Sequence, residues 1–89
     1  MARYFLDLHE CGAVIDDLDG IEAESLDEVR TKVLSAIRDV MCGEIREGRL
    51  CLSCHIDARG PDGRSVMTVP FRDAIAISGL GTDESGATD

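Results

Sequence analysis

The chain opens with a strict alternation of apolar and polar positions. Between residues 3 and 9, one side carries Tyr4, Leu6 and Leu8, and the other carries Arg3, Phe5, Asp7 and His9. A period of two is typical of a β-strand with one buried face. Cys11 and Gly12 then offer a turn, and "AVID" from Ala13 predicts a short returning strand. The acidic run "DDLDG" from Asp16 ends this strand and predicts a loop.

A helical period begins near residue 26. Ser25 and Glu28 have the spacing of a capping box, in which two side chains satisfy amide groups left unbonded at a helix start. Positions three and four residues apart then form one apolar stripe: Leu26, Val29, Val33, Ala36, Ile37 and Val40. Glu44 falls in line with this stripe, so we expect the helix to bend or fray after Gly43 and to stop by Gly48.

Alternation returns in "LCLSCHIDAR", residues 50 to 59, and predicts a third strand. One face would carry Leu50, Leu52, Cys54, Ile56 and Ala58, and the other Cys51, Ser53, His55, Asp57 and Arg59. "GPDG" at residues 60 to 63 is typical of a tight turn, and "SVMTVPF" predicts a fourth strand. Because Pro70 cannot donate to a strand ladder, this strand should lie at a sheet edge or end there.

The order of elements is thus β-β-α-β-β. Two hairpins and one amphipathic helix predict an α+β fold, a two-layer sandwich in which the helix covers one face of an antiparallel sheet of about four strands. Residues 1–77 should form a single domain, because 89 residues support one modest core. Residues 78–89 are rich in Gly, contain no base and have almost no apolar side chain, which predicts a disordered acidic tail.

Several short motifs resemble those of an uncharacterised bacterial family of short proteins, a domain of unknown function. Its members open with "PRYF", pass through an acidic "D-x-x-G" into a helix of the "S-L-x-E-A" type, and close with "DG-R … TVPF". The matching pieces here are "ARYF", "DLDG", "SLDEV", "EGR" and "DGRSVMTVPFRDA", over residues 1 to about 74. In layout only, the chain is also similar to HicB-like antitoxin domains. The resemblance implies the fold and no activity.

The charge balance narrows the classes of partner. The chain has 18 acidic and 9 basic residues, a net charge of −9, and no Lys or Arg lies between Arg3 and Arg30. Such a charge repels phosphate backbones and anionic lipid, so neither non-specific nucleic-acid binding nor membrane binding is expected, and a basic protein is the favoured partner. No secretory signal and no run of ~18 apolar residues is present, which predicts a cytoplasmic protein with reduced cysteines.

The motif "CLSCH", Cys51 to His55, has the spelling of a c-type haem attachment site. In a strand, however, Cys51 and Cys54 would point to opposite faces, so they should neither bind haem nor form a disulfide with each other. Thioredoxin-like chemistry is disfavoured as well, because no helix is predicted to begin beside the pair. No cofactor is expected.

Metal binding and catalysis are weaker hypotheses. Alternation places His9, Cys51 and His55 on the same outer face, which makes them candidate zinc ligands, although one pair alone has ligand spacing. "DDLDGIEAE" lacks the first and last carboxylates of a calcium loop. Each histidine stands singly on the polar face of a strand without an assigned nucleophile, so the chain is not expected to be an enzyme.

Two functional hypotheses therefore remain. The first is a non-catalytic, acidic protein-interaction module that self-associates as a homodimer, through equivalent edge strands or through the outer face, with a basic protein as its favoured other partner. Its interaction candidates are Phe5, His9, His55, Asp16, Asp17 and Asp19. The alternative is a metal- or redox-responsive protein that uses the outer-face His and Cys residues.

Overall fold

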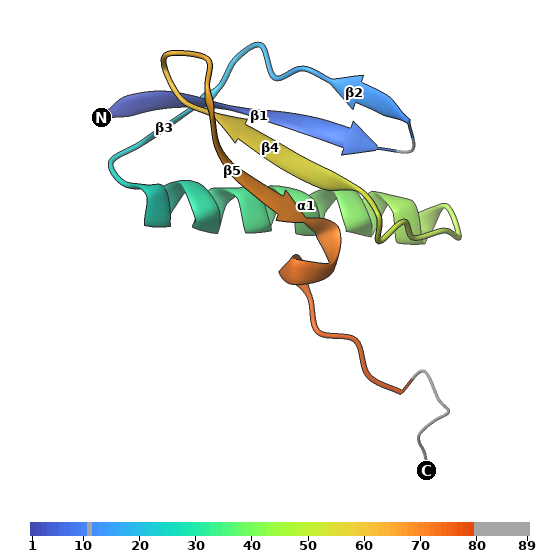
Figure 1. Cartoon of the computed structure of the whole chain (residues 1–89). Coiled ribbons are helices and arrows are strands. Elements are labelled where there is room, and N and C mark those ends of the chain that lie inside the picture. The colour runs from blue at the N-terminus through green and yellow to red at the C-terminus, as the bar shows by residue number, and fades with distance from the viewer. Residues whose placement is uncertain (11, 80–89) are drawn as a thin grey trace.

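The computed structural model describes residues 1–10 and 12–79 of the chain. Within this part the fold is α+β, with an antiparallel sheet packed against one long helix (Figure 1). The elements are β1 (Ala2–Glu10), β2 (Ala13–Ile15), β3 (Ile21–Ala23), α1 (Leu26–Arg46), β4 (His55–Arg59), β5 (Ser65–Pro70) and a 3-10 helix η1 (Phe71–Ala74). The predicted fold class is confirmed, with the order extended to β-β-β-α-β-β by the unforeseen strand β3.

The helix begins at Leu26, as the capping box predicts. The Ser25 hydroxyl accepts a hydrogen bond from the Glu28 amide at 3.1 Å, and the Glu28 carboxylate accepts one from the Glu24 amide at 2.8 Å. α1 continues through Gly43 to Arg46, so the expected fraying after Gly43 does not occur. The reason is that Glu44 is buried and its carboxylate accepts the Cys51 amide at 3.2 Å.

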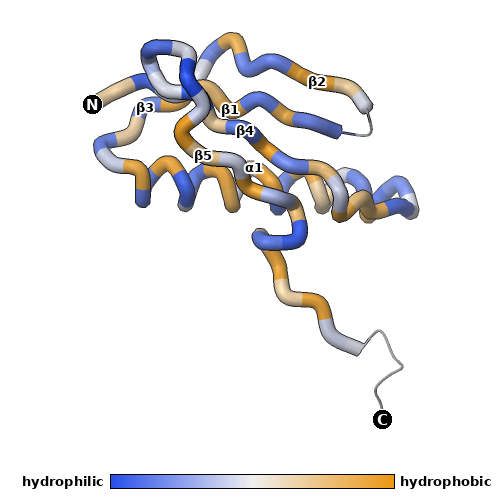
Figure 2. Tube along the Cα trace, viewed as in Figure 1, coloured by the Kyte–Doolittle hydropathy of each residue, from blue (hydrophilic) through white to orange (hydrophobic). Residues whose placement is uncertain are grey.

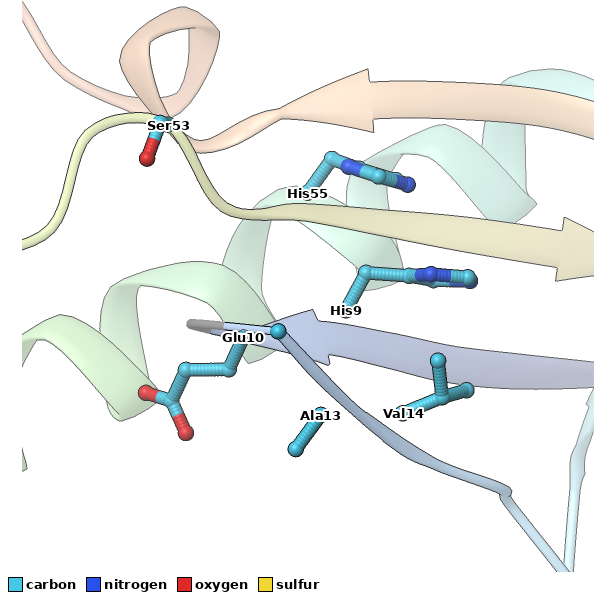
Figure 3. A pocket seen from close by; sticks show the side chains of 7 residues that line it. His9, Glu10, Ala13, Val14, Ser53 and His55 are labelled. Carbon is cyan, nitrogen blue, oxygen red and sulfur yellow. The ribbon is translucent and has the colours of Figure 1, made fainter.

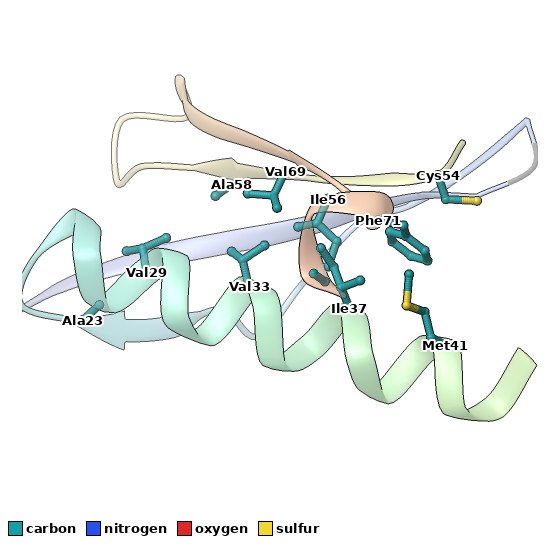
Figure 4. Close-up of a cluster of buried hydrophobic side chains, with 11 residues drawn as sticks. Ala23, Val29, Val33, Ile37, Met41, Cys54, Ile56, Ala58, Val69 and Phe71 are labelled. Carbon is teal, nitrogen blue, oxygen red and sulfur yellow. The ribbon is translucent and has the colours of Figure 1, made fainter. Parts of the chain in front are cut away.

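The core lies between the helix and one face of the sheet (Figure 4). Figure 2 shows polar and apolar residues alternating along α1, which is the amphipathic pattern that such packing needs. Tyr4, Leu6 and Leu8 pack on the core from β1, as predicted. The fully or nearly buried apolar residues are Ala23, Val29, Val33, Ile37, Met41, Cys54, Ile56, Ala58, Val69, Phe71 and Ala74.

The sheet has the order β2-β1-β4-β5, and β3 also pairs with β1. β2 pairs with the end of β1, where Leu8 lies opposite Ile15, and β3 pairs with its beginning, where Tyr4 lies opposite Ile21. One edge of β1 is thus shared by two short strands, while its other edge pairs with β4. β5 is an edge strand that ends at Pro70, as predicted.

The third strand is shorter than predicted, because β4 begins at His55 rather than at Leu50. β1 ends at Glu10 and the chain turns back into β2, so residues 50–54 have no continuing strand beside them. The backbone there bonds to other elements: the Cys51 amide donates to Glu44, and the Cys54 carbonyl accepts the Phe71 amide at 2.9 Å. The prediction that Cys51 and Cys54 point to opposite faces of a strand is therefore wrong.

Asp17 fills the gap between β2 and β3. One of its carboxylate oxygens accepts the Leu6 amide of β1 at 3.0 Å. The other accepts the amides of Asp19 at 3.2 Å and Gly20 at 3.0 Å. A side chain thus takes the place of a neighbouring strand, and the backbone of β1 remains satisfied where neither β2 nor β3 reaches it.

Gly20 allows the chain to return to β1 at close range. Its φ is +76°, in the left-handed region, and a Cβ at this position would lie 2.8 Å from the Tyr4 carbonyl oxygen and 3.0 Å from the Phe5 ring. Both the backbone angle and the space therefore require glycine.

A second buried interaction connects this loop to the sheet. Asp7 is 6 % exposed although it lies on the outer face of β1, and the Arg59 Nε of β4 donates to it at 2.6 Å. The Asp17 amide donates to the same carboxylate at 3.0 Å. These interactions, with the Arg59 hydrogen bond as the largest cause, hold the pKa of Asp7 below its usual value. The carboxylate thus joins β1, β4 and the acidic loop.

We predict that Gly20→Ala destabilises the protein by more than about 2 kcal/mol, because a left-handed residue with a Cβ costs roughly 1–2 kcal/mol before any clash. Gly63→Ala is the matched control, since its φ is +84° but nothing lies within 4 Å of the added Cβ. Urea denaturation of both variants measures the difference. Equal losses would show that the close approach to Tyr4 contributes nothing.

We predict that Asp7→Asn lowers the free energy of unfolding at pH 7 by about 1–3 kcal/mol, because Arg59 loses its charged partner. Since the folded-state pKa of Asp7 is lowered, its contribution is present above the unfolded-state pKa and is lost as the pH falls through the folded-state pKa. The difference between wild type and variant should therefore shrink below about pH 4. Denaturation curves over that pH range test this, and a constant difference would contradict it.

Candidate functional site

The outer face of the sheet, away from α1, carries most of the residues that the sequence singled out. The register aligns them in three rows across the strands: Val14, His9, His55 and Pro70; then Asp7, Asp57 and Thr68; then Phe5, Arg59 and Ser65. The Asp57 carboxylate accepts the hydroxyl of Thr68 in its own row at 3.1 Å and that of Ser65 in the next row at 2.5 Å. The charged side chains of Asp7, Asp57 and Arg59 on this face thus all have hydrogen-bond partners.

His9 and His55 are brought together as a stacked pair (Figure 3). Their ring centroids are 4.4 Å apart and the ring planes differ by 15°. A cavity of about 380 Å³ adjoins the rings, at the end of the β1–β2 hairpin. Figure 3 shows the Glu10 side chain directed away from the rings of His9 and His55. The side of the cavity next to these rings is therefore lined by imidazole and not by a carboxylate.

The predicted grouping of His9, Cys51 and His55 is not formed. Cys51 lies in the loop before β4, half-buried against the core, and the Cys54 thiol donates to its sulfur at 2.9 Å. Within residues 1–10 and 12–79, no cluster of three or more His, Cys, Asp or Glu is arranged to hold a metal ion. The motif "CLSCH" also divides between faces, because Cys54 is 2 % exposed in the core while His55 stacks on the outer face.

Phe5 is less open than the sequence suggests. Its side chain is half-buried on the outer face, the Arg59 guanidinium lies 5.2 Å from the ring centroid, and the Gly20 backbone closes on the ring edge. A cation–π contact of this kind holds the ring within its own domain. Phe5 therefore offers little free apolar surface for face-to-face stacking.

The three acidic candidates have different surroundings. Asp17 is half-buried, and its carboxylate accepts three backbone amides. Asp16 and Asp19 are exposed on the loop that joins β2 to β3. Arg3 bridges this loop and β3, because it donates to the Asp19 carbonyl at 2.6 Å and to the Glu22 carboxylate at 3.0 Å. The carboxylates that can meet a partner here are those of Asp16 and Asp19.

An open strand edge lies beside these carboxylates, and little in the sequence predicts it. All three residues of β2 are exposed, and apolar side chains predominate: Val14 is 56 %, Ile15 55 % and the nearby Leu18 87 % exposed. The available signal is the run of apolar residues Ala13, Val14 and Ile15, which lacks the apolar–polar alternation of a strand with one buried face. We call Ala13–Ile15 together with Leu18 the β2 edge.

The hydrogen-bond phase of the β2 edge follows from the register. The Leu6 amide donates to Asp17 on the side of β1 that faces β2, so the N–H and C=O of Leu8, two positions on, face that side too. Leu8 and Ile15 are therefore a hydrogen-bonded pair, and such pairs alternate along an antiparallel ladder. The N–H and C=O of Val14 therefore point away from β1. The same alternation makes Asp7 and Asp57 a hydrogen-bonded pair between β1 and β4, so the N–H and C=O of Asp57 point toward β1. Asp57 and Thr68 are then a pair without hydrogen bonds, and the N–H and C=O of Thr68 point outward from β5 at the opposite edge of the sheet.

A pair of carboxyl groups lies where the helix ends below the hairpin. Glu10 of β1 is hydrogen-bonded to Glu44, and this bond, with burial, raises the pKa of Glu10. The same bond lowers the pKa of Glu44, which also accepts the Cys51 amide and faces Arg49 at 3.4 Å. The two groups share one proton more readily than isolated carboxyls do. Glu44 is thus a buried polar anchor for the loop that carries Cys51.

Comparisons with known proteins give a family and nothing further. No helix in the described part of the chain is both long enough and apolar enough to cross a membrane. Neither the curated proteins nor the solved structures contain a match to this sequence. A family model, described as a domain of unknown function, matches residues 3–72. This agrees with the expected membership of an uncharacterised domain family, and the chain belongs to the family of that domain of unknown function, DUF6894.

Proposed function

We propose that the protein is a non-catalytic protein-interaction module that binds an extended, basic segment of a partner along the β2 edge. The observation that carries this proposal is the exposure of Val14, Ile15 and Leu18 at a strand edge that no other described strand pairs with, and the carboxylates of Asp16 and Asp19 lie beside them. Exposed apolar residues framed by one sign of charge are typical of a surface that meets another chain.

The backbone supplies the attachment. Because the N–H and C=O of Val14 point outward, a strand laid beside β2 can both donate to and accept from this residue. Main-chain bonds of this kind give affinity, and alternate side chains give specificity. A partner strand would place every second side chain near Val14 on the outer face or near Ile15 on the opposite one.

Charge selects the partner. The chain carries −9, and around the β2 edge Asp16 and Asp19 are exposed while Arg3 is held by Asp19 and Glu22. A segment that alternates Lys or Arg with apolar residues meets both the carboxylates and the apolar side chains. An acidic segment of the same shape is repelled.

The test is a binding titration with a labelled synthetic peptide in which Lys and Val alternate, followed by fluorescence anisotropy. The expected result is saturable binding by the wild-type protein and none by the matched peptide in which Glu replaces Lys. Val14→Pro removes the outward N–H without touching a bond to β1, and it should weaken binding at least about tenfold.

Thr68→Pro is the matched control, because it removes an equivalent outward N–H from the other sheet edge. Binding by this variant should equal that of the wild type once circular dichroism shows both variants folded. Equal binding of the Lys and Glu peptides, or undiminished binding by Val14→Pro, would contradict the proposal.

Self-association is a second candidate, favoured by the composition of the same edge. Ala13, Val14 and Ile15 include no Lys, Pro or inward charge of the kind that protects edge strands from pairing, so a second copy could pair with β2 around a two-fold axis. Pairing through Phe5 is disfavoured, since Arg59 and Gly20 cover that ring.

Salt separates the two candidates. Two copies that each carry −9 repel, so a β2-edge dimer should tighten as salt rises from about 0.05 to about 0.5 M, whereas binding of the Lys-Val peptide should weaken over the same range. Light scattering after size exclusion, over a concentration series, measures the dimer. A wild type that stays monomeric at high micromolar concentration in high salt would exclude self-association through this edge.

A further inference from the structure

The loop between α1 and β4 holds two thiols in direct contact. The Cys54 thiol donates a hydrogen bond to the Cys51 sulfur, and the two sulfur atoms are 2.9 Å apart. They belong to the C-x-x-C of "CLSCH". Bond formation would need the sulfurs to approach by roughly 0.9 Å to reach the ~2.05 Å of a disulfide.

The backbone on both sides of the pair is fixed. The Cys51 amide donates to the buried carboxylate of Glu44 at 3.2 Å, and the Cys54 carbonyl accepts the Phe71 amide at 2.9 Å. Figure 4 shows Cys54 at the end of the core cluster, beyond Phe71. Anchors at both ends fix the backbone on either side of the pair and so keep the two thiols within reach of each other.

The two thiols differ in access. Cys54 is 2 % exposed, while Cys51 is half-buried and can be reached from solvent. A solvent-accessible thiol beside a buried one is the arrangement of an attacking and a resolving cysteine. From these contacts we propose that Cys51 and Cys54 form a reversible redox pair, in which a peroxide oxidises Cys51 and Cys54 closes an intramolecular disulfide.

The steps balance with hydrogen peroxide as the oxidant. The Cys51 thiolate attacks one peroxide oxygen, the O–O bond breaks, and the sulfur becomes a sulfenic acid while hydroxide takes up the thiol proton and leaves as water. The Cys54 thiolate then attacks the Cys51 sulfur, the S–O bond breaks, and a second water leaves with the Cys54 proton. Two thiols lose two electrons and the peroxide is reduced. A small dithiol returns the pair by exchange.

Oxidation changes the surroundings of the residue between the cysteines. The Cys51 sulfur is 3.2 Å from the Ser53 hydroxyl, and Ser53 lines the cavity beside His9 and His55. A disulfide draws the Cys51 sulfur toward Cys54 and ends its role as a thiol partner for that hydroxyl. Oxidation of the pair would therefore change the hydrogen bonding of Ser53, which lines the cavity.

The test is mass spectrometry of the full chain after native treatment with about one equivalent of hydrogen peroxide, alkylation of the remaining thiols and digestion with trypsin. Arg49 and Arg59 bound the peptide Leu50–Arg59, which contains both cysteines. The expected product is this peptide lighter by two hydrogens, without alkyl groups, and doubly alkylated again after prior reduction with dithiothreitol.

Two variants sharpen the result. Cys42→Ser removes an exposed cysteine outside the pair and should leave the product unchanged. Cys51→Ser, a change at a half-buried position, should abolish it and leave Cys54 a thiol. The proposal is overturned if peroxide leaves the wild-type peptide doubly alkylated. It is equally overturned if Cys51 is carried to a sulfinic acid or is linked to Cys11 or Cys42 in place of Cys54.

Discussion

The fold depends on how the backbone of one edge of β1 is satisfied. β1 is the central strand, and the chain that returns beside it pairs only at the two ends, through β2 and β3. An unpaired amide in the middle would cost more free energy than most surface interactions provide. Asp17 prevents this by accepting the Leu6 amide, and Gly20 lets the chain come close enough for β3 to resume pairing. The position of the acidic loop, and with it the β2 edge, follows from these two residues.

The acidity of the chain therefore has two parts. Some carboxylates are engaged inside the protein: Asp7 with Arg59, Asp17 with three amides, and Glu44 with Cys51 and Arg49. Others, such as Asp16 and Asp19, face solvent. Net charge alone does not separate the two groups, and only the second group acts on a partner at short range. Asp16 and Asp19 place part of this exposed charge beside the β2 edge.

Much of the fold could be predicted because its signals are local. The helix start depends on Ser25 and Glu28, three residues apart, and both hairpins depend on short turn sequences. The errors lie where distant residues decide. Leu52 and Cys54 pack on the core from a loop, so the sequence alternates there as it would in a strand. No strand forms, because β1 ends at Glu10 and leaves these residues without a pairing partner. Asp7 looked like a surface residue, because its partner Arg59 is 52 positions away. The contact of Cys51 with Cys54 could not be predicted for the same reason, because a strand over residues 50–59 would place the two side chains on opposite faces.

The return path beside β1 also fixes the length of the acidic loop. Ile15 lies opposite Leu8 and Ile21 opposite Tyr4, so the chain advances six positions while β1 runs back four. β2 and β3 are in effect one strand with two extra residues, and an even number preserves the alternation of faces. A one-residue shift of β3 along β1 would turn Ala23 out of the core and Glu22 into it. A residue inserted between β2 and β3 must therefore bulge out of the loop, clear of the contacts that Asp17 and Gly20 make with β1.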